Sequence, residues 1–139
     1  MGRANTVRYK AHFLTLSLVL LLSRAPAYGH HSFAAEYNTD KPVQITGTVT
    51  KVEWTNPHVH FYVDVKNDRG EVVNWNIELG PPLILRHLGW RENSLKTGDQ
   101  VTVEGYLAKD HSSLANAKKV TLADGRSVFA GSSVEKRGE

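Results

Sequence analysis

Four polar side chains that could carry chemistry alternate with apolar ones in a short stretch of the chain. His58, His60, Tyr62 and Asp64 take the even positions, and valines and Phe61 take the odd ones. Successive side chains of a strand point to opposite faces. The sequence therefore predicts a strand with one apolar face for the core and one face that holds two imidazoles, a phenol and a carboxylate.

The spacing of the two histidines is that of a half-site for a metal ion. His58 and His60 stand two residues apart, so strand geometry puts them about 6–7 Å apart on one face. A carboxylate behind a ligating histidine is the expected supporting group. The alternative is a polar sheet face that hydrogen-bonds to itself. With the next predicted strand included, the candidate ligand face consists of Tyr62, Asp64, Asn76 and Glu78.

A second pair of histidines, His30 and His31, follows a segment typical of a leader. Cleavage after Gly29 would give His30 a free amine beside its imidazole, which is a natural chelate for copper. Cleavage after Ala27 would make His30 the third residue, and its imidazole, two backbone amides and the amine would suit Cu(II) or Ni(II). The alternative is a solvated arm that binds metal weakly. The candidate metal ligands are His30, His31, His58 and His60.

Residues 1–29 have the pattern of a secretory signal peptide. Arg3, Arg8 and Lys10 precede a short apolar run over 11–22, and small residues follow over 23–29. The run is shorter than the ~20 residues that a membrane-spanning helix needs. We therefore expect a cleaved leader, a periplasmic or secreted mature protein, and no integral membrane segment after cleavage. An uncleaved signal anchor is the alternative.

Removal of this leader changes the charge balance of the chain. The whole sequence has 17 basic and 14 acidic residues, and Arg3, Arg8, Lys10 and Arg24 are the basic residues that precede residue 29. The mature chain then carries 13 basic and 14 acidic residues, a net charge of −1. Without a basic surface we expect no nucleic-acid partner. The absence of cysteine excludes disulfides and thiolate chemistry.

The order of the predicted elements is strand, strand, strand, helix, strand, strand. The first strand, over 43–54, changes its apolar phase near Thr50-Lys51, which predicts a bulge. A long, bent first strand favours an all-β fold, a five-stranded OB-like Greek-key barrel with one short helix between strands three and four. The predicted organisation is a signal peptide over 1–29, an N-terminal arm over 30–42, the barrel over 43–130 and a flexible tail over 131–139.

Strand parity also predicts which side chains are buried. In strand three, Val73, Trp75, Ile77 and Leu79 point inward, while Asn74, Asn76 and Glu78 point outward. The helix after Gly80 is densely apolar, so we expect it to close one barrel end, with Arg86 and His87 facing out. A turn is predicted over 66–71, a polar loop over 110–116, and strand five over 117–122.

Several short motifs resemble those of a family of small exported bacterial proteins of unknown function. They are His30-His31-Ser32-Phe33-Ala34-Ala35-Glu36, Gly47-Thr48-Val49, Glu53-Trp54-Thr55-Asn56-Pro57-His58, Asn74-Trp75, Gly89-Trp90, Ser94-Leu95-Lys96, Gly98-Asp99 and Gly105-Tyr106. The resemblance covers nearly the whole mature chain and implies export and a small OB-like barrel, but no reaction. Members commonly have a bulky apolar residue at the position of His60, so the resemblance carries no role over to that residue.

These observations leave three functional hypotheses. The first is a small exported protein that binds copper, or another divalent transition metal, through its histidines. The second is a metal-free OB-type module that binds a small molecule, a peptide or an envelope partner. The third and weakest is an enzyme, since a copper oxidase of the histidine-brace kind would need a third nitrogen near His30. No nucleophile elbow, phosphate-binding glycine loop or zinc protease motif is present.

Overall fold

The computed structural model describes residues 33–131. The predicted signal peptide, the tail from residue 132 and the histidines His30 and His31 lie outside these residues. Within them the chain forms two short helices and six strands. In chain order they are α2 (Phe33–Glu36), β1 (Tyr37–Glu53), β2 (His60–Lys66), β3 (Val72–Glu78), α3 (Pro82–His87), β4 (Gln100–Ala108), β5 (Leu114–Leu122) and β6 (Ser127–Phe129).

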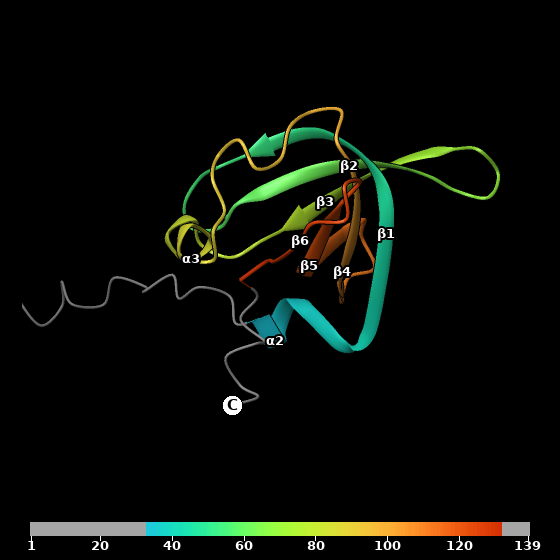
Figure 1. Ribbon diagram of the computed structural model, residues 1–139. Helices are drawn as coiled ribbons and strands as arrows, with labels where there is room; N and C mark the ends of the chain where they lie inside the picture. Colours follow the sequence, from blue (N-terminus) through green and yellow to red (C-terminus); the bar gives the residue numbers. More distant parts are fainter. Residues whose placement is uncertain (1–32, 132–139) are drawn as a thin grey trace, which may run out of the picture. The chain divides into compact units, whose positions relative to one another are not determined.

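The six strands form one sheet in the order β3-β2-β1-β4-β5-β6 (Figure 1). All neighbours in this order are antiparallel. β3 also pairs with β5 in parallel, so backbone hydrogen bonds run through β1, β2, β3, β5 and β4 and back to β1. The prediction of a mostly β chain is confirmed.

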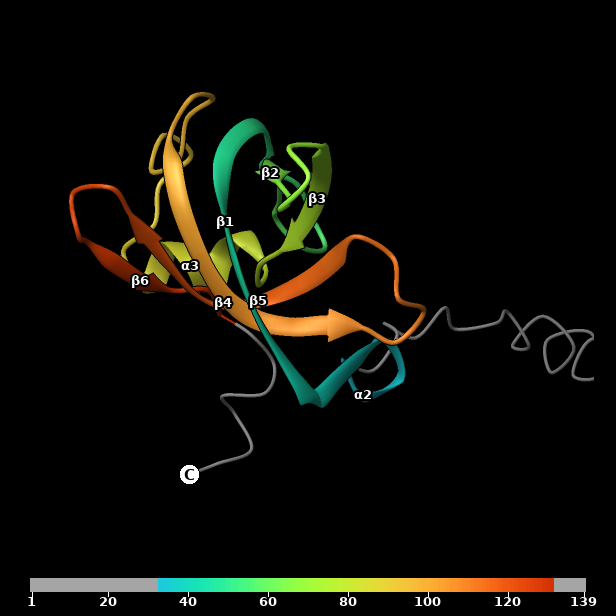
Figure 2. The ribbon, with the colours of Figure 1, turned by 90° about the vertical axis from the view of Figure 1, so that its right-hand side faces the viewer.

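The first strand is long because it pairs with two neighbouring strands, one after the other. Its N-terminal part pairs with β4 and its C-terminal part with β2, and Figure 2 shows it curving from one to the other. The register shifts between Val49 and Lys51, which confirms the predicted bulge. At Gly47 a Cβ atom would collide with the backbone oxygen of Asp64, so only glycine permits this approach of β1 to β2.

β1 begins at Tyr37, well before the predicted start at residue 43. The polar stretch over 38–42 was predicted as part of an arm, because it carries turn-forming residues and no apolar alternation. Tyr37 pairs with Ala108 and Pro42 with Tyr106, which connects both ends of this stretch to β4, and the register shifts between the two pairs. Strand pairing therefore overrides the local turn preference here.

The buried core lies inside this ring of strands. The predicted inward residues of β2 are confirmed, since Val59, Phe61 and Val63 are fully buried. Ile77 of β3 and Leu79, which follows this strand, are buried, and Trp75 packs against the core. The remaining core residues include Ile45, Val49, Val101, Val103, Ala115, Ala117 and Val120.

Two predictions for β3 are wrong. Val73 is 36% exposed, because it stands where the β2–β3 hairpin extends past the core. Glu78, predicted to face outward, is 8% exposed. The side chain of Glu78 is buried although its parity is that of the polar face, because the side chains of Tyr37 and His58 lie against its carboxylate.

The helix α3 covers the core with part of its surface only. Leu85 and the following Trp90 are buried, and the indole nitrogen of Trp90 donates to the backbone oxygen of Phe129 at 2.8 Å. Leu83 and Leu88 are exposed, although the dense apolar pattern predicted a helix that closes one barrel end. A helix this short can bury only one stripe of its side chains. Arg86 is exposed as predicted.

The C-terminal strands also differ from the prediction. β5 starts at Leu114 rather than at residue 117, because its first residues pair with β3. Asn116, expected in a polar loop, is therefore a buried strand residue. A short sixth strand, β6, pairs with β5 in addition to the five predicted strands.

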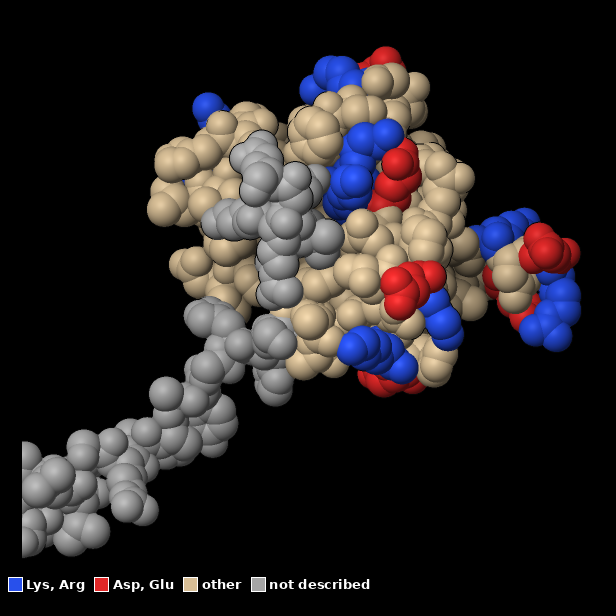
Figure 3. All heavy atoms as spheres, turned by 90° about the horizontal axis from the view of Figure 1, so that it is seen from below, with Lys and Arg blue, Asp and Glu red and all other residues tan. Residues whose placement is uncertain are grey.

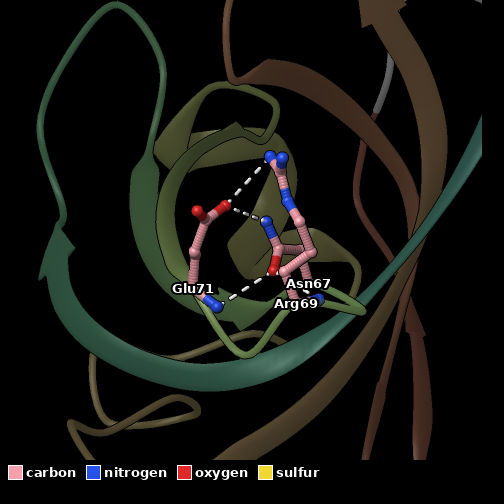
Figure 4. Close-up of polar contacts among 3 residues, drawn as sticks. All are labelled: Asn67, Arg69 and Glu71. Atoms are coloured by element: carbon pink, nitrogen blue, oxygen red, sulfur yellow. Dashed lines mark hydrogen bonds and ion pairs between the residues drawn. The ribbon is translucent and has the colours of Figure 1, made fainter.

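The predicted turn over 66–71 closes the β2–β3 hairpin. Figure 4 shows Asn67, whose carboxamide oxygen accepts from the backbone N–H of Glu71 at 2.9 Å and whose amide donates to the Glu71 carboxylate at 2.8 Å. Arg69 pairs with the same carboxylate. On the face drawn in Figure 3, acidic side chains stand beside basic ones. No helix among the described residues is long and apolar enough to cross a membrane.

Candidate functional site

The centre of the candidate site is the buried carboxylate of Glu78. This residue ends β3, and its backbone pairs with His60 of β2 on one side and Asn116 of β5 on the other. Its side chain is only 10% exposed. A buried carboxylate is costly unless hydrogen bonds or charges compensate it. The two oxygens of Glu78 have such partners, and each comes from a different part of the chain.

One oxygen is bonded to the first residue of β1. The hydroxyl of Tyr37 donates to Oε2 of Glu78. Tyr37 is 2% exposed. Burial, followed by the hydrogen bond and charge of Glu78, raises the pKa of Tyr37 far above its ordinary value. The phenol therefore stays protonated and remains a donor to the carboxylate at any physiological pH.

The other oxygen is bonded to a histidine in the β1–β2 connection. Nδ1 of His58 lies 2.7 Å from Oε1 of Glu78, and the His58 side chain is 31% exposed. Tyr37, Glu78 and His58 thus form a chain of hydrogen bonds, named here the Tyr37–Glu78–His58 chain, which leads from a buried phenol to a half-buried imidazole.

His60 has a different partner. Its Nδ1 lies 2.9 Å from the carboxamide oxygen of Asn76 on β3. His58 and His60 are therefore bonded to two different side chains of β3. Among residues 33–131, no group of three or more histidine, aspartate or glutamate side chains could hold a metal ion. His30 and His31, the other two predicted metal ligands, lie outside these residues.

The other predicted ligand-face residues are bonded to side chains of the neighbouring strands. The hydroxyl of Tyr62 donates to Glu53 at 3.0 Å, and Lys51 forms an ion pair with the same carboxylate. Lys51 and then Tyr62 hold the pKa of Glu53 below its ordinary value. Asn74 donates to Asp64 at 2.7 Å. Of the four predicted ligand-face residues, Glu78 alone belongs to the Tyr37–Glu78–His58 chain.

The helix α2 attaches the N-terminal end of the described chain to this site. The ring of Phe33 lies 5.2 Å from that of Tyr37 and 5.9 Å from that of Tyr106, measured between centroids. The backbone N–H of Lys109 donates to the oxygen of Glu36 at 2.8 Å. Phe33 is thus packed on the tyrosine that bonds to Glu78.

Sequence reasoning missed two members of the site environment. Tyr37 was assigned to an arm because no apolar period surrounds it, and its role depends on a partner 41 residues away. Glu53 is bonded to Tyr62, a pairing that the sequence pattern did not predict. One signal was available for Glu78, since it is the only carboxylate in the predicted strand three and stands on the parity that also holds Asn76.

A solved structure with some similarity is a crystal structure of the mitochondrial single-stranded DNA binding protein Rim1 from S. cerevisiae. It shares 15% sequence identity with this chain, with a TM-score of 0.47, and the match covers 60% of this chain and 93% of that one. No curated protein matches the chain significantly. The model of a family described as of unknown function, DUF6152, matches residues 18–116. This match spans most of the chain and includes β1, β2, β3 and the Tyr37–Glu78–His58 chain, so the protein belongs to the DUF6152 family.

Proposed function

We propose that this protein is an exported metal-binding protein, with copper as the expected ion, and that His58 is one of its ligands. The observation that carries the proposal is the buried carboxylate of Glu78 at 2.7 Å from Nδ1 of His58. Histidines that ligate metals commonly donate their second ring N–H to a carboxylate, which fixes the ring and raises its basicity. Imidazole nitrogen is a preferred ligand of copper, nickel and zinc.

The energetics of Glu78 support a functional reading. Replacing a buried charged pair by apolar residues is often neutral or stabilising, so a buried carboxylate is weak evidence for stability alone. At this site the chain keeps the carboxylate and adds a buried phenol as its second partner. The arrangement suits a histidine whose ring must be held in one orientation to bind a metal ion.

The position of Phe33 supports the inclusion of the N-terminal histidines. His31 stands two residues before Phe33, and two residues span at most about 7 Å. Phe33 packs on Tyr37, which reaches His58 through Glu78. These contacts connect the segment that follows His30 and His31 to the residues that are bonded to His58, which supports the inclusion of both histidines in the proposal. His60 is expected to contribute less, since its Nδ1 is bonded to Asn76.

The proposal includes a fold and a location. The ring of paired strands, with α3 between β3 and β4, supports an OB-like Greek-key barrel. Residues 1–29 support export to the periplasm or the medium. Intact-mass analysis of the mature protein should find an N-terminus at Tyr28 or His30. A mature protein that still begins at Met1 or Gly2 would refute export by a cleaved leader.

The test is a titration with Cu(II), Ni(II) and Zn(II) on protein that has its true mature N-terminus. Copper affinity is measured for the wild type, His31→Ala, His58→Ala and the double variant. Ligands that share one ion are strongly non-additive, whereas independent sites add within about 0.5 kcal/mol. His87→Ala is the matched control, because His87 is an exposed histidine of α3. Its substitution should leave copper affinity unchanged.

The outcomes separate the functional hypotheses. Coupled losses at His31 and His58 support one shared ion. Additive losses would reduce the metal site to a terminal chelate and leave the β2–β3 face to the metal-free hypothesis of a small-molecule, peptide or envelope partner. Copper affinity that is unchanged by both substitutions would end the metal proposal.

A further inference from the structure

The Tyr37–Glu78–His58 chain also has a consequence for the ring of His58 before any metal binds. Glu78 presents two oxygens to this chain, and Oε2 already accepts from the phenol of Tyr37. Oε1 lies 2.7 Å from Nδ1 of His58. A carboxylate oxygen accepts hydrogen bonds, so the nitrogen that faces it must carry the proton.

We infer that Glu78 and Tyr37 are positioning residues, which hold neutral His58 as the tautomer with hydrogen on Nδ1. This inference deepens the proposed function, and the change in copper affinity expected below rests on that function. A neutral imidazole exposed to water favours hydrogen on Nε2, so the inferred tautomer is the opposite of the one expected for a histidine with no such partner.

Tyr37 contributes by fixing the carboxylate. It is buried, it donates to Oε2, and its backbone is paired with Ala108 of β4. The carboxylate is therefore attached to β3 through its own chain and to β1 through the phenol. With both oxygens held, rotation of the carboxylate away from His58 would break a buried hydrogen bond. The orientation of the imidazole is then determined by two strands rather than by the β1–β2 connection that carries it.

The test reads the tautomer directly. Two-bond ¹⁵N–¹H correlation spectra of the full mature protein distinguish pyrrole-like from pyridine-like ring nitrogens. They would be recorded without metal at pH ~8, above the ordinary imidazole pKa of ~6.5. In the wild type, Nδ1 of His58 should be pyrrole-like and Nε2 pyridine-like. His87, exposed on α3, is the internal control and should show the reverse pattern.

A Tyr37→Phe/Glu78→Leu double variant removes both partners and leaves neither of them buried alone. His58 should then adopt mainly the tautomer with hydrogen on Nε2. Copper affinity should fall roughly 10- to 100-fold, the usual effect of losing such supporting groups. Tyr37→Phe alone keeps the carboxylate and is expected to retain the Nδ1–H tautomer with a smaller loss of copper affinity. It also provides a milder variant for the copper measurement if the double variant folds poorly.

The two claims fail in different ways. A wild-type His58 with hydrogen on Nε2 would overturn the inference, even if copper binding depends on His58. Retention of the Nδ1–H tautomer in the folded double variant would also overturn it. A third outcome is possible, in which the wild type shows the expected tautomer, the double variant loses it, and no copper binds. That outcome would uphold the inference and refute the proposed function.

Discussion

The hydrogen bond between Tyr37 and Glu78 leads to a prediction about stability that can be tested by the removal of one oxygen atom. Tyr37→Phe removes only the phenol oxygen and keeps the ring that packs on Phe33. The lost bond ends on a carboxylate whose side chain is 10% exposed, so water cannot readily replace the donor. Hydrogen bonds to charged groups contribute about 1.5–3 kcal/mol. We therefore expect unfolding free energy to fall by about 2 kcal/mol.

Tyr106→Phe is the matched control for this measurement. The ring of Tyr106 also contacts Phe33, and within the described residues its hydroxyl has no hydrogen-bond partner. Its loss should cost well under 1 kcal/mol, the usual range for a surface change that breaks no specific interaction.

Urea denaturation followed by tryptophan fluorescence measures both variants. With a slope of about 1.5 kcal/mol/M, the Tyr37 variant should lose about 1.3 M of its midpoint. Equal midpoint losses in the two variants would refute the reasoning, because the effect would then belong to the ring and not to the bond with Glu78. A changed slope would mean that the substitution altered the unfolded or folded ensemble, and the comparison would have to be made by double-mutant cycle.

Three further predictions concern other parts of the sheet. The indole N–H of Trp90 donates a hydrogen bond, whereas that of Trp54 is buried without a partner in the described structure. Trp90→Phe should therefore lower the unfolding free energy by about 1–3 kcal/mol more than Trp54→Phe, as measured by urea denaturation. Lys51→Met should raise the pKa of Glu53 toward its ordinary value in an NMR titration, since the ammonium is the main cause of its lowering. In the wild type, the stability that Glu53 contributes is present above its unfolded-state pKa and is lost as pH falls through the lower folded-state pKa. Gly47→Ala should lower the unfolding free energy by about 1–3 kcal/mol, because an added Cβ atom would overlap the neighbouring strand. Thermal or urea unfolding measures this change, and wild-type stability in the variant would contradict the close approach of β1 to β2.

Local pattern was sufficient for most of the strands. The alternation of Val59, Phe61 and Val63 with polar residues predicts which face of β2 is buried, because a half-buried strand must put its apolar residues on one side. The phase change near Thr50 predicts the bulge of β1, since two apolar parities within one strand cannot both face the core without an extra residue. These features depend on neighbours in sequence, which is why one sequence is enough to find them.

Local pattern failed where burial depends on a second strand. Glu78 has the parity of an exposed residue, and parity does not predict that Tyr37 of β1 and His58 lie against its carboxylate. The parallel pairing of β3 with β5 covers this end of β3, and it also draws Asn116 from an expected loop into the sheet. The same pairing leaves Val73 exposed at the far end, where only β2 lies beside it.

The sequence by itself determined the candidate chemistry: histidines of two separate segments, a strand with one polar face, and no cysteine. It also determined the bulged first strand, through the order of apolar residues. Only the tertiary structure decided that His58 is bonded to Glu78 and that Tyr37 supports the same carboxylate. The physical reason is that hydrogen bonding between side chains far apart in sequence depends on how the strands pair, and long-range pairing leaves no periodic trace in the residues that it brings together.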